Sequence, residues 1–193
     1  MKKIPTLFKR VFDDEHKVDI LPKITAGCED AFLHGKATIK MDGSCCAIIG
    51  GEFYRRYDAN AKYGKTVPDG AIKCQEQADP VTGHLPCWVK CDRNNTDDKW
   101  FWKAYDNMIG KRTDDTYEAY GKHFNGNPYE MKYDILEKHG LREVTVERTF
   151  KAVKQFLAEN DIEGLVFWLD NEPVCKIKRT DFGFLWNQHE ERK

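Results

Sequence analysis

Lys40 is the residue of this chain whose surroundings point most directly to chemistry. It stands in the pentapeptide Lys40-Met41-Asp42-Gly43-Ser44, at the end of an expected strand. An amine beside a glycine and a small hydroxyl suits a phosphate group, because glycine lets the backbone come close. To attack phosphorus the amine must be neutral, whereas an ordinary lysine has a pKa of about 10.4. Burial or nearby positive charge favours the neutral form.

Lys176 and Lys178 are suited to supply that positive charge. Residues two apart on a strand face the same side, so both ammonium groups should lie on one face of an expected C-terminal hairpin. There they would favour neutral Lys40 and hold phosphate groups as negative charge builds in the transition state. Taken alone, a Lys-x-Lys pair is more typical of a solvated face of an edge hairpin.

Glu163 and Glu118 form the acidic half of the expected site. Glu163 precedes Gly164 and an apolar run, where a carboxylate would be held firmly. Such a position suits a ligand for a divalent metal that bridges phosphate oxygens. Glu118 lies in the middle of an expected strand and could accept a hydrogen bond from a ribose hydroxyl. Taken singly, each glutamate is more typical of a surface residue.

Arg55 and Arg56 follow the Gly50-Gly51 turn. A guanidinium can donate two parallel hydrogen bonds to a ribose or a phosphate. Strand alternation puts the two arginines on opposite faces, so only one of them looks into a pocket beneath Lys40. Both faces carry an aromatic residue, and periodicity therefore leaves the choice open.

The elements expected around these residues are mainly strands joined in hairpins. The segment 37–58 is read as one hairpin unit with strands at 37–40, 44–49 and 52–58, and further strands are expected at 115–120, 165–169 and 174–179. Helices are expected at 99–109, with Thr96 or Asp97 as N-cap, and at 146–160, with Glu147 in the first turn and Asn160 at the end. Loops are expected at 62–74, 79–86 and 121–129. Hairpins with few helices predict an α+β fold built on antiparallel sheets.

Length and composition predict one soluble domain over residues 1–193. A chain of this size buries about two thirds of its unfolded surface. The formal net charge is −1. This excludes a protein that coats nucleic acid through an overall positive charge. Residues 1–12 are basic but contain no apolar run long enough for a signal peptide, so we expect none there. No stretch of the sequence approaches the ~20 apolar residues that span a bilayer.

Seven cysteines, two of them adjacent at Cys45-Cys46 inside an apolar run, predict reduced thiols and a cytoplasmic protein. A second possible metal site, for zinc, consists of Cys74, Cys87 and Cys91 with His84 nearby. They lack the two tight ligand pairs that structural zinc sites use. Small buried or loop cysteines are therefore the favoured reading.

The ordered set of motifs resembles the covalent nucleotidyltransferases, which include polynucleotide ligases and mRNA capping enzymes. The set is Lys40-x-Asp42-Gly43, Arg56-Tyr57-Asp58, Glu118, Glu163-Gly164 and Lys176-x-Lys178. Longer phrases resemble the small ATP-dependent RNA ligases of the vertebrate RNA ligase 1 type: Arg55-Arg56-Tyr57-Asp58, Tyr117-Glu118-Ala119-Tyr120-Gly121, Gly126-Asn127-Pro128-Tyr129, His139-Gly140 and Glu163-Gly164-Leu165-Val166-Phe167-Trp168. The resemblance runs from about Ile24 to Trp186.

The resemblance implies a ligase-type adenylation domain and a three-step reaction. Lys40 would take AMP from ATP as a phosphoramide, the AMP would pass to the 5′-phosphate of RNA, and a 3′-hydroxyl would displace it. The roles carried over by position make Lys40 the nucleophile and Glu163 the ligand of Mg²⁺ or Mn²⁺. The remaining nucleotide contacts would be Asp42 and Gly43 in the motif, Arg56 and Glu118 at the ribose and nearby phosphate, and Lys176 and Lys178 at the phosphates. The aromatic residue that packs on adenine is unassigned, and the strand 117–120 is its favoured source.

Only a short segment follows Lys178, so we expect a nearly bare catalytic core without an appended C-terminal nucleic-acid-binding domain. That expectation disfavours capping and predicts weak RNA affinity or a partner protein that delivers the RNA. Two alternatives stay open: a DNA nick-sealing ligase, and a non-catalytic nucleotide- or RNA-binding module that keeps the fold. The presence of Lys40, both glutamates and the lysine pair disfavours the non-catalytic module.

Overall fold

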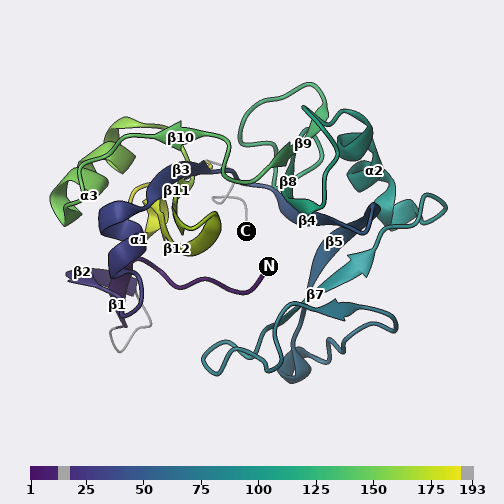
Figure 1. Ribbon diagram of the computed structural model, residues 1–193, viewed down its shortest axis with the longest axis horizontal. Coiled ribbons are helices and arrows are strands. Elements are labelled where there is room, and N and C mark those ends of the chain that lie inside the picture. Colours follow the sequence, from purple (N-terminus) through teal and green to yellow (C-terminus); the bar gives the residue numbers. More distant parts are fainter. Residues whose placement is uncertain (13–17, 188–193) are drawn as a thin grey trace. The chain divides into compact units, whose positions relative to one another are not determined.

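The computed structural model describes residues 1–12 and 18–187, and within them the chain is an α+β protein with antiparallel sheets and few helices. Its residues form two compact units (Figure 1). Unit 1 contains residues 1–3 and 42–139, and unit 2 contains the described residues among 4–41 and 140–193. That the two act as one adenylation domain stays a prediction. Among the described residues, no helix is both long and apolar enough to cross a membrane.

Unit 2 is built on a four-stranded sheet with the strand order β10-β3-β11-β12. Its strands, all paired antiparallel, are β3 (Lys36–Lys40), β10 (Glu143–Val144), β11 (Gly164–Leu169) and β12 (Glu172–Lys178). A two-stranded sheet of β1 (Phe8–Phe12) and β2 (Val18–Ile24) belongs to the same unit. Alternate residues of the larger sheet enter an apolar core with α1 (Glu29–His34) and α3 (Phe150–Glu159); they include Ala37, Leu165, Phe167 and Ile177. The other face of that sheet carries Lys40, Lys176 and Lys178, together with Val166 and Trp168.

Unit 1 is built on a six-stranded sheet with the order β6-β7-β5-β4-β8-β9. Its strands are β4 (Ser44–Ile49), β5 (Glu52–Ala59), β6 (Ile72–Lys73), β7 (Leu85–Lys90), β8 (Asp115–Gly121) and β9 (Asp134–Lys138). One face packs against α2 (Lys99–Asp106), and the core between them includes Cys46, Phe53, Ala104, Tyr117 and Leu136. The opposite face carries the polar residues described below.

The turn between β4 and β5 is the expected Gly50-Gly51 turn. Both glycines have positive φ angles, of 59° and 77°, which few other residues adopt. Their N–H groups donate to the two carboxylate oxygens of Asp114, at 2.6 and 3.0 Å. The turn is therefore tied to the residue that precedes β8.

Several expected boundaries were wrong. The segment 37–58 is not one hairpin unit, because β3 and β4 lie in different sheets and only β4 pairs with β5. Strands occur where loops were expected: β6 within 62–74, and the start of β7 within 79–86. Strand β9 was not expected at all.

The ends of two helices also differ from expectation, and hydrogen bonds explain both. Asp98, rather than Thr96 or Asp97, is the N-cap residue of α2, and its carboxylate binds Arg55 and the N–H of Asp92 instead of capping the helix. Helix α3 begins after Thr149, whose hydroxyl accepts the N–H of Ala152 at 3.1 Å. Glu147 therefore lies before this helix, while Asn160 ends it as expected.

Five of the seven free cysteines are buried, and the pKa of four of these thiols is raised, which makes stability depend on alkaline pH; Cys91 is one of the four. Burial, aided by the Asp98 charge, raises the pKa of Cys91 from 9.0 to about 12. The unfolded thiol ionises near 9, so its contribution to stability is complete below that pH and is lost as the pH rises toward 12. We expect the Tm to fall over this range, and the fall to be smaller in Cys91→Ala. Parallel Tm curves for variant and wild type from pH 7 to 11 would contradict this assignment.

Candidate functional site

In unit 1, one row of the six-stranded sheet gathers polar residues from neighbouring strands. Cys45 on β4 pairs with Glu118 on β8, and Glu118 pairs with Glu137 on β9. The β4–β5 register, in which Cys46 pairs with Arg55, sets Arg56 beside Cys45. Residues opposite one another in antiparallel strands share a face. These side chains therefore line the face away from α2, and Glu118 and Glu137 are only 8% and 7% exposed.

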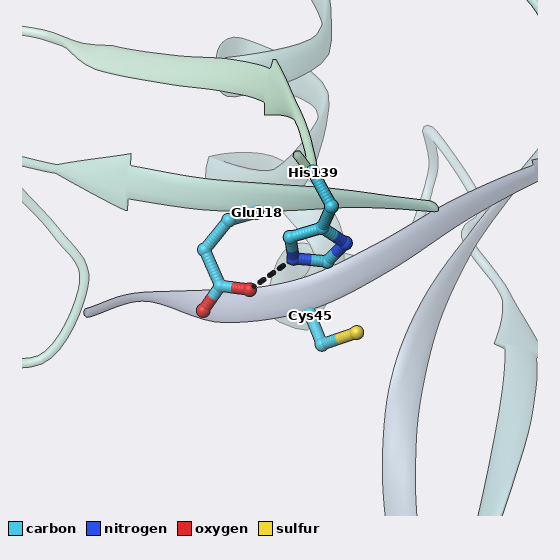
Figure 2. A group of neighbouring side chains, drawn as sticks. All are labelled: Cys45, Glu118 and His139. Atoms are coloured by element: carbon cyan, nitrogen blue, oxygen red, sulfur yellow. Dashed lines mark hydrogen bonds and ion pairs between the residues drawn. The ribbon is translucent and has the colours of Figure 1, made fainter. Parts of the chain in front are cut away.

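Each of the two buried glutamates has its own partner. The Glu118 carboxylate binds Nε2 of His139 at 2.8 Å, and Nδ1 of His139 lies 3.0 Å from the Thr116 hydroxyl (Figure 2 shows Glu118, His139 and Cys45). The Glu137 carboxylate accepts the Tyr120 hydroxyl at 2.7 Å. Carboxylates directly opposite one another repel, and these partners offset the repulsion. Glu118 is thus buried and held by a hydrogen bond, unlike a typical surface glutamate, while its contact with a ribose hydroxyl stays a prediction.

The choice between Arg55 and Arg56 is settled by their partners. Arg55 faces α2, where its Nε donates to Asp98 at 2.6 Å. Arg56 shares the face of Glu118, and its Nε donates to Asp58 at 2.9 Å. The Asp98 side chain is only 2% exposed, against 41% for Asp58. Arg55 is therefore part of the core packing, and Arg56 is the arginine on the polar face.

This difference predicts opposite phenotypes for the two arginines. Arg55→Ala leaves Asp98 buried without its cation, so we expect a loss of about 1.5–3 kcal/mol in the free energy of unfolding. Arg56→Ala breaks a more exposed pair and should cost under about 1 kcal/mol. If Arg56 binds nucleotide, only its removal should weaken nucleotide binding at full stability. Chemical denaturation and nucleotide titration of both variants check this, and equal destabilisation by the two would contradict it.

Asp42 and Gly43 are held by the loop that follows β8. Nδ2 of Asn125 donates to the Asp42 carboxylate at 2.7 Å and to the Gly43 carbonyl at 2.8 Å. The Asp42 N–H donates to the Tyr129 hydroxyl at 2.6 Å. A Cβ at Gly43 would meet the Ala119 carbonyl oxygen at 2.3 Å, so only glycine fits here. The second half of the Lys-x-Asp-Gly motif is therefore a tightly held turn.

In unit 2, the middle strand β11 brings two of the predicted lysines together. Gly164 pairs with Lys40 on one side and with Lys178 on the other. The two lysine side chains consequently stand on one face of the sheet, with no side chain at the position between them. A Cβ at Gly164 would meet the Ile177 carbonyl oxygen at 2.2 Å. Glycine is thus required for β11 and β12 to approach at this point.

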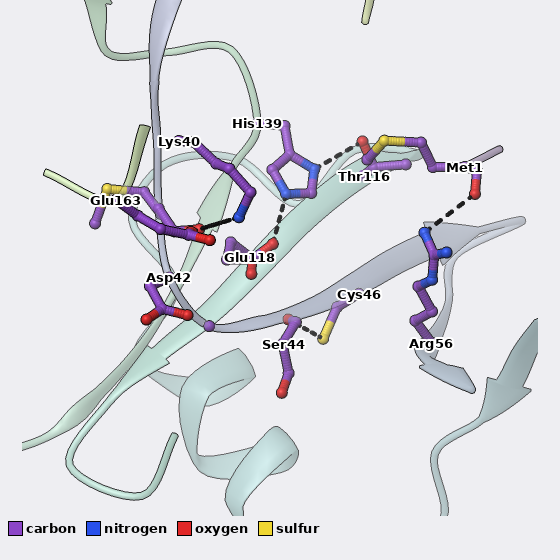
Figure 3. A network of polar contacts seen from close by, with 12 residues as sticks. Met1, Lys40, Asp42, Ser44, Cys46, Arg56, Thr116, Glu118, His139 and Glu163 are labelled. Carbon is purple, nitrogen blue, oxygen red and sulfur yellow. Dashed lines mark hydrogen bonds and ion pairs between the residues drawn. The ribbon is translucent and has the colours of Figure 1, made fainter. Parts of the chain in front are cut away.

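Glu163 joins these two lysines. One carboxylate oxygen pairs with the Lys40 ammonium, and the other pairs with the Lys178 ammonium at 2.7 Å (Figure 3 shows Lys40 and Glu163). The Glu163 side chain is 5% exposed, and those of Lys40 and Lys178 are 20% and 36% exposed. A buried carboxylate therefore serves as counter-ion to two ammonium groups. We call these three residues the Lys–Glu–Lys cluster.

The backbone next to the cluster is fixed by further contacts. The Arg179 N–H donates to the Glu163 carbonyl at 2.8 Å. The Lys178 N–H donates at 2.8 Å to the carboxylate of Asp181, which also pairs with Arg10. These bonds set the position of Glu163 relative to the end of β12 before any ligand arrives.

Lys176 lies on the same face as Lys178, as the two-residue spacing predicts, but in the row of Val166 and Thr38. Its backbone bonds to the N-terminal segment: the Lys176 N–H donates to the Pro5 carbonyl at 3.0 Å, and the Leu7 N–H donates to the Lys176 carbonyl at 2.7 Å. Strand β12 is therefore covered at this point, rather than being the open edge of a hairpin.

Sequence reasoning missed several polar residues of the site. Cys45, Asn125, Tyr129, Glu137 and His139 were given no role, although Tyr129 and His139 occur in the phrases quoted above. Glu137 belongs to the site because it pairs with Glu118 across β8 and β9. The sequence alone does not reveal that these two strands are neighbours. Of the two tyrosines on β8, Tyr117 enters the apolar core, whereas Tyr120 shares the face of Glu118.

Only one group of three or more metal-binding side chains occurs among the described residues, and it consists of Cys45, Glu118 and His139. The set Cys74, Cys87, Cys91 and His84 does not form a group of that kind. Searches with models of known protein families and against curated proteins found no match to the chain.

Proposed function

We propose that this protein is an ATP-dependent RNA ligase of the covalent nucleotidyltransferase type. The observation that carries the proposal is the Lys–Glu–Lys cluster, in which an amine in the Lys-x-Asp-Gly motif is oriented by a buried carboxylate beside a second ammonium group. A nucleophilic lysine needs a fixed orientation and a phosphate needs nearby positive charge. The cluster offers both on one sheet face. The ordered motifs described above support the same family.

In the proposed first step, the Lys40 amine attacks the α-phosphate of ATP. A P–N bond forms, the bond between the α-phosphate and its bridging oxygen breaks, and pyrophosphate leaves. The proton of the ammonium group must leave before the attack, and the Glu163 carboxylate is its immediate acceptor. Lys178 and Lys176 would offset negative charge on the phosphates as it builds.

The ribose and its adjoining phosphate are assigned to residues of unit 1. Arg56 offers guanidinium donors, and Glu118 offers a carboxylate held by His139. Asp42 and Gly43 would adjoin the nucleotide through the turn held by Asn125. Because hydrogen bonds already orient Glu118 and this turn, little ordering of these groups themselves would remain for binding.

Glu163 also fits the proposed divalent metal. An ionised carboxylate has about four lone-pair sites, and Lys40 and Lys178 take one oxygen each. Glu163 therefore retains acceptor capacity for Mg²⁺ or Mn²⁺, which prefer carboxylate oxygen. When bound, such an ion would neutralise charge on the phosphate oxygens.

The later steps of the proposal concern RNA. The AMP on Lys40 would pass to an RNA 5′-phosphate, and a 3′-hydroxyl would then attack the activated phosphate and release AMP. A partner protein that delivers the RNA is part of this proposal, as is a cytoplasmic location. DNA nick sealing and mere nucleotide or RNA binding are the competing outcomes of the experiment below.

The test incubates the protein with α-labelled ATP or α-labelled GTP and magnesium, and then measures the label retained on denatured protein. We expect retention from ATP alone, as an acid-labile phosphoramide, and transfer of the label to 5′-phosphorylated RNA. Transfer only to nicked DNA would favour the DNA ligase. Labelling by GTP would favour capping chemistry, and binding without any label would favour the non-catalytic module.

The lysine pair yields a prediction for the rate of labelling. Lys178→Met removes the second cation from Glu163, so the full negative charge acts on Lys40 and favours its charged form. We expect slower adenylation and a pH–rate profile moved to higher pH. Lys176→Met should slow the reaction through the phosphates with a smaller shift of the profile. Both Tm values should stay near wild type, because partly exposed lysines contribute little to stability. Wild-type rates from both variants would remove the support that the lysine pair gives to the ligase proposal.

A further inference from the structure

Cys45, Glu118 and His139 place three different metal-binding atoms close together on one face of unit 1. The cysteine sulphur, a glutamate oxygen and a histidine nitrogen all lie within 4.8 Å of one another (Figure 2). The Glu118 residue is 8% exposed and the His139 side chain 18%. The proposed ligase reaction uses only Glu118 directly, so the grouping of all three has no explanation from that reaction.

Backbone pairing brings the three donors together. Cys45 and Glu118 are direct partners in the β4–β8 ladder, which places their side chains side by side on one face. His139 follows β9, and its N–H donates to the Thr116 carbonyl at 3.1 Å. Thr116 lies two residues before Glu118 on β8, so Cys45 and Glu118 are set by strands, and His139, in the turn directly after β9, is tied to β8. Sites on such elements hold their geometry well.

The surroundings of His139 match those of a metal-bound histidine. Its Nε2 faces Glu118, and its Nδ1 lies 3.0 Å from the Thr116 hydroxyl. A metal ligand needs one ring nitrogen deprotonated and the other held by an outer partner. A cation would replace the proton that Nε2 shares with Glu118, and the Thr116 hydroxyl could then accept a hydrogen bond from Nδ1–H. Thr116 is therefore positioned to orient the ligand.

The donor types select the class of ion. Thiolate and imidazole suit Zn²⁺ and related transition ions, whereas Mg²⁺ prefers oxygen alone. Three protein ligands leave the fourth tetrahedral position of Zn²⁺ open, unlike the closed sets of structural sites. We propose that Cys45, Glu118 and His139 bind a zinc-class divalent cation. On binding, the thiol proton of Cys45 and any proton on Nε2 pass to solvent.

A cation at this position would also occupy Glu118. If Glu118 binds the ribose, as the proposed function holds, the ion and the nucleotide compete for one carboxylate. Zinc would then inhibit adenylation through Cys45. This inhibitory part rests on the proposed function, whereas ion binding itself does not.

The test uses Co²⁺ as a spectroscopic probe, added to the whole protein with a phosphine reductant and without nucleotide. We expect a thiolate-to-cobalt charge-transfer band that Zn²⁺ displaces. The band should be lost in Cys45→Ser, and Thr116→Val should weaken binding by about 10–100-fold. Cys74→Ser is the matched control, because it removes a half-buried thiol of the same unit from outside the group, and it should keep the band.

A band that persists in Cys45→Ser, or Co²⁺ binding without a thiolate band, would overturn the site. If Cys45→Ser loses its native circular dichroism, His139→Gln and Thr116→Val decide instead, and unchanged affinity in both counts against the proposal. Labelling with α-labelled ATP then tests inhibition: Zn²⁺ should block wild type and Cys74→Ser but spare Cys45→Ser. Equal inhibition of all three would refute the inhibitory part. A failure of all labelling would instead refute the ligase function, and the cobalt result would still stand.

Discussion

Lys40→Ala should abolish the covalent nucleotide adduct while the protein stays folded. The proposed nucleophile is removed, yet Glu163 keeps its second partner, Lys178, so no buried carboxylate is left unpaired. Lys40→Arg should give the same loss at nearly wild-type stability, because a guanidinium preserves the positive charge but stays protonated and cannot attack. Label retained on denatured protein and the Tm, measured for both variants, check this expectation.

Lys36 offers a matched control on the same strand and the same face. It lies four residues before Lys40 on β3, and its ammonium binds the Gly140 carbonyl at 3.2 Å and Glu143 at 3.5 Å. Lys36→Ala should cost under about 1 kcal/mol and leave labelling intact. Labelling that survives in folded Lys40→Ala, or that vanishes equally in Lys36→Ala, would show that Lys40 is not the nucleophile.

Glu163→Gln should slow adenylation by about 10²–10⁴-fold, the range expected when a positioned acid–base group is lost. The variant leaves the Lys40 and Lys178 ammonium groups adjacent without a shared anion. Since that arrangement disfavours the charged form of Lys40, the pH–rate profile should move to lower pH, opposite to the shift in Lys178→Met. We expect a stability loss of about 1–3 kcal/mol. Single-turnover labelling across pH checks both the rate and the direction of the shift.

The same variant separates the two roles assigned to Glu163. If Glu163 also binds the metal, raising Mg²⁺ or Mn²⁺ should recover part of the lost rate. Glu172→Gln, at an exposed position on β12, is the control and should behave like wild type. A defect that ignores metal concentration and comes with unfolding would mark Glu163 as structural, and a wild-type rate would exclude it from the reaction.

Sequence patterns predicted the strands that carry Lys40, Glu118 and Lys178, because each is marked by alternation or by a nearby glycine turn. The patterns failed where strands are short or atypical. β6 has only two residues, β7 contains Pro86, and β9 has three charged residues among five yet is mostly buried. Such strands depend on their neighbours for stability, and local pattern does not reveal neighbours.

The sequence indicated several individual residues of the candidate site, but it did not indicate which of them contact one another. Glu163 was expected to be firmly held, and it is buried. Its contact with both lysines depends on the register of Gly164 between β3 and β12, and the pairing with Lys40 joins residues more than a hundred positions apart in the chain. The same limit applies to His139, whose partner Glu118 is found only through the pairing of β8 with β9.

The way the chain divides between its two units has a consequence for biosynthesis. Residues 42–139 of unit 1 are continuous, whereas unit 2 takes residues from both sides of that segment. Domains form during synthesis as their residues emerge, so unit 1 can acquire its sheet while β11 and β12 are still being made. The counter-ion and neighbouring cation of Lys40 then arrive only with Glu163 and Lys178. A nascent chain halted before Glu163 would already contain the residues of unit 1 yet lack the carboxylate that pairs with Lys40, so the proposed reaction of Lys40 would wait until β11 and β12 have been made.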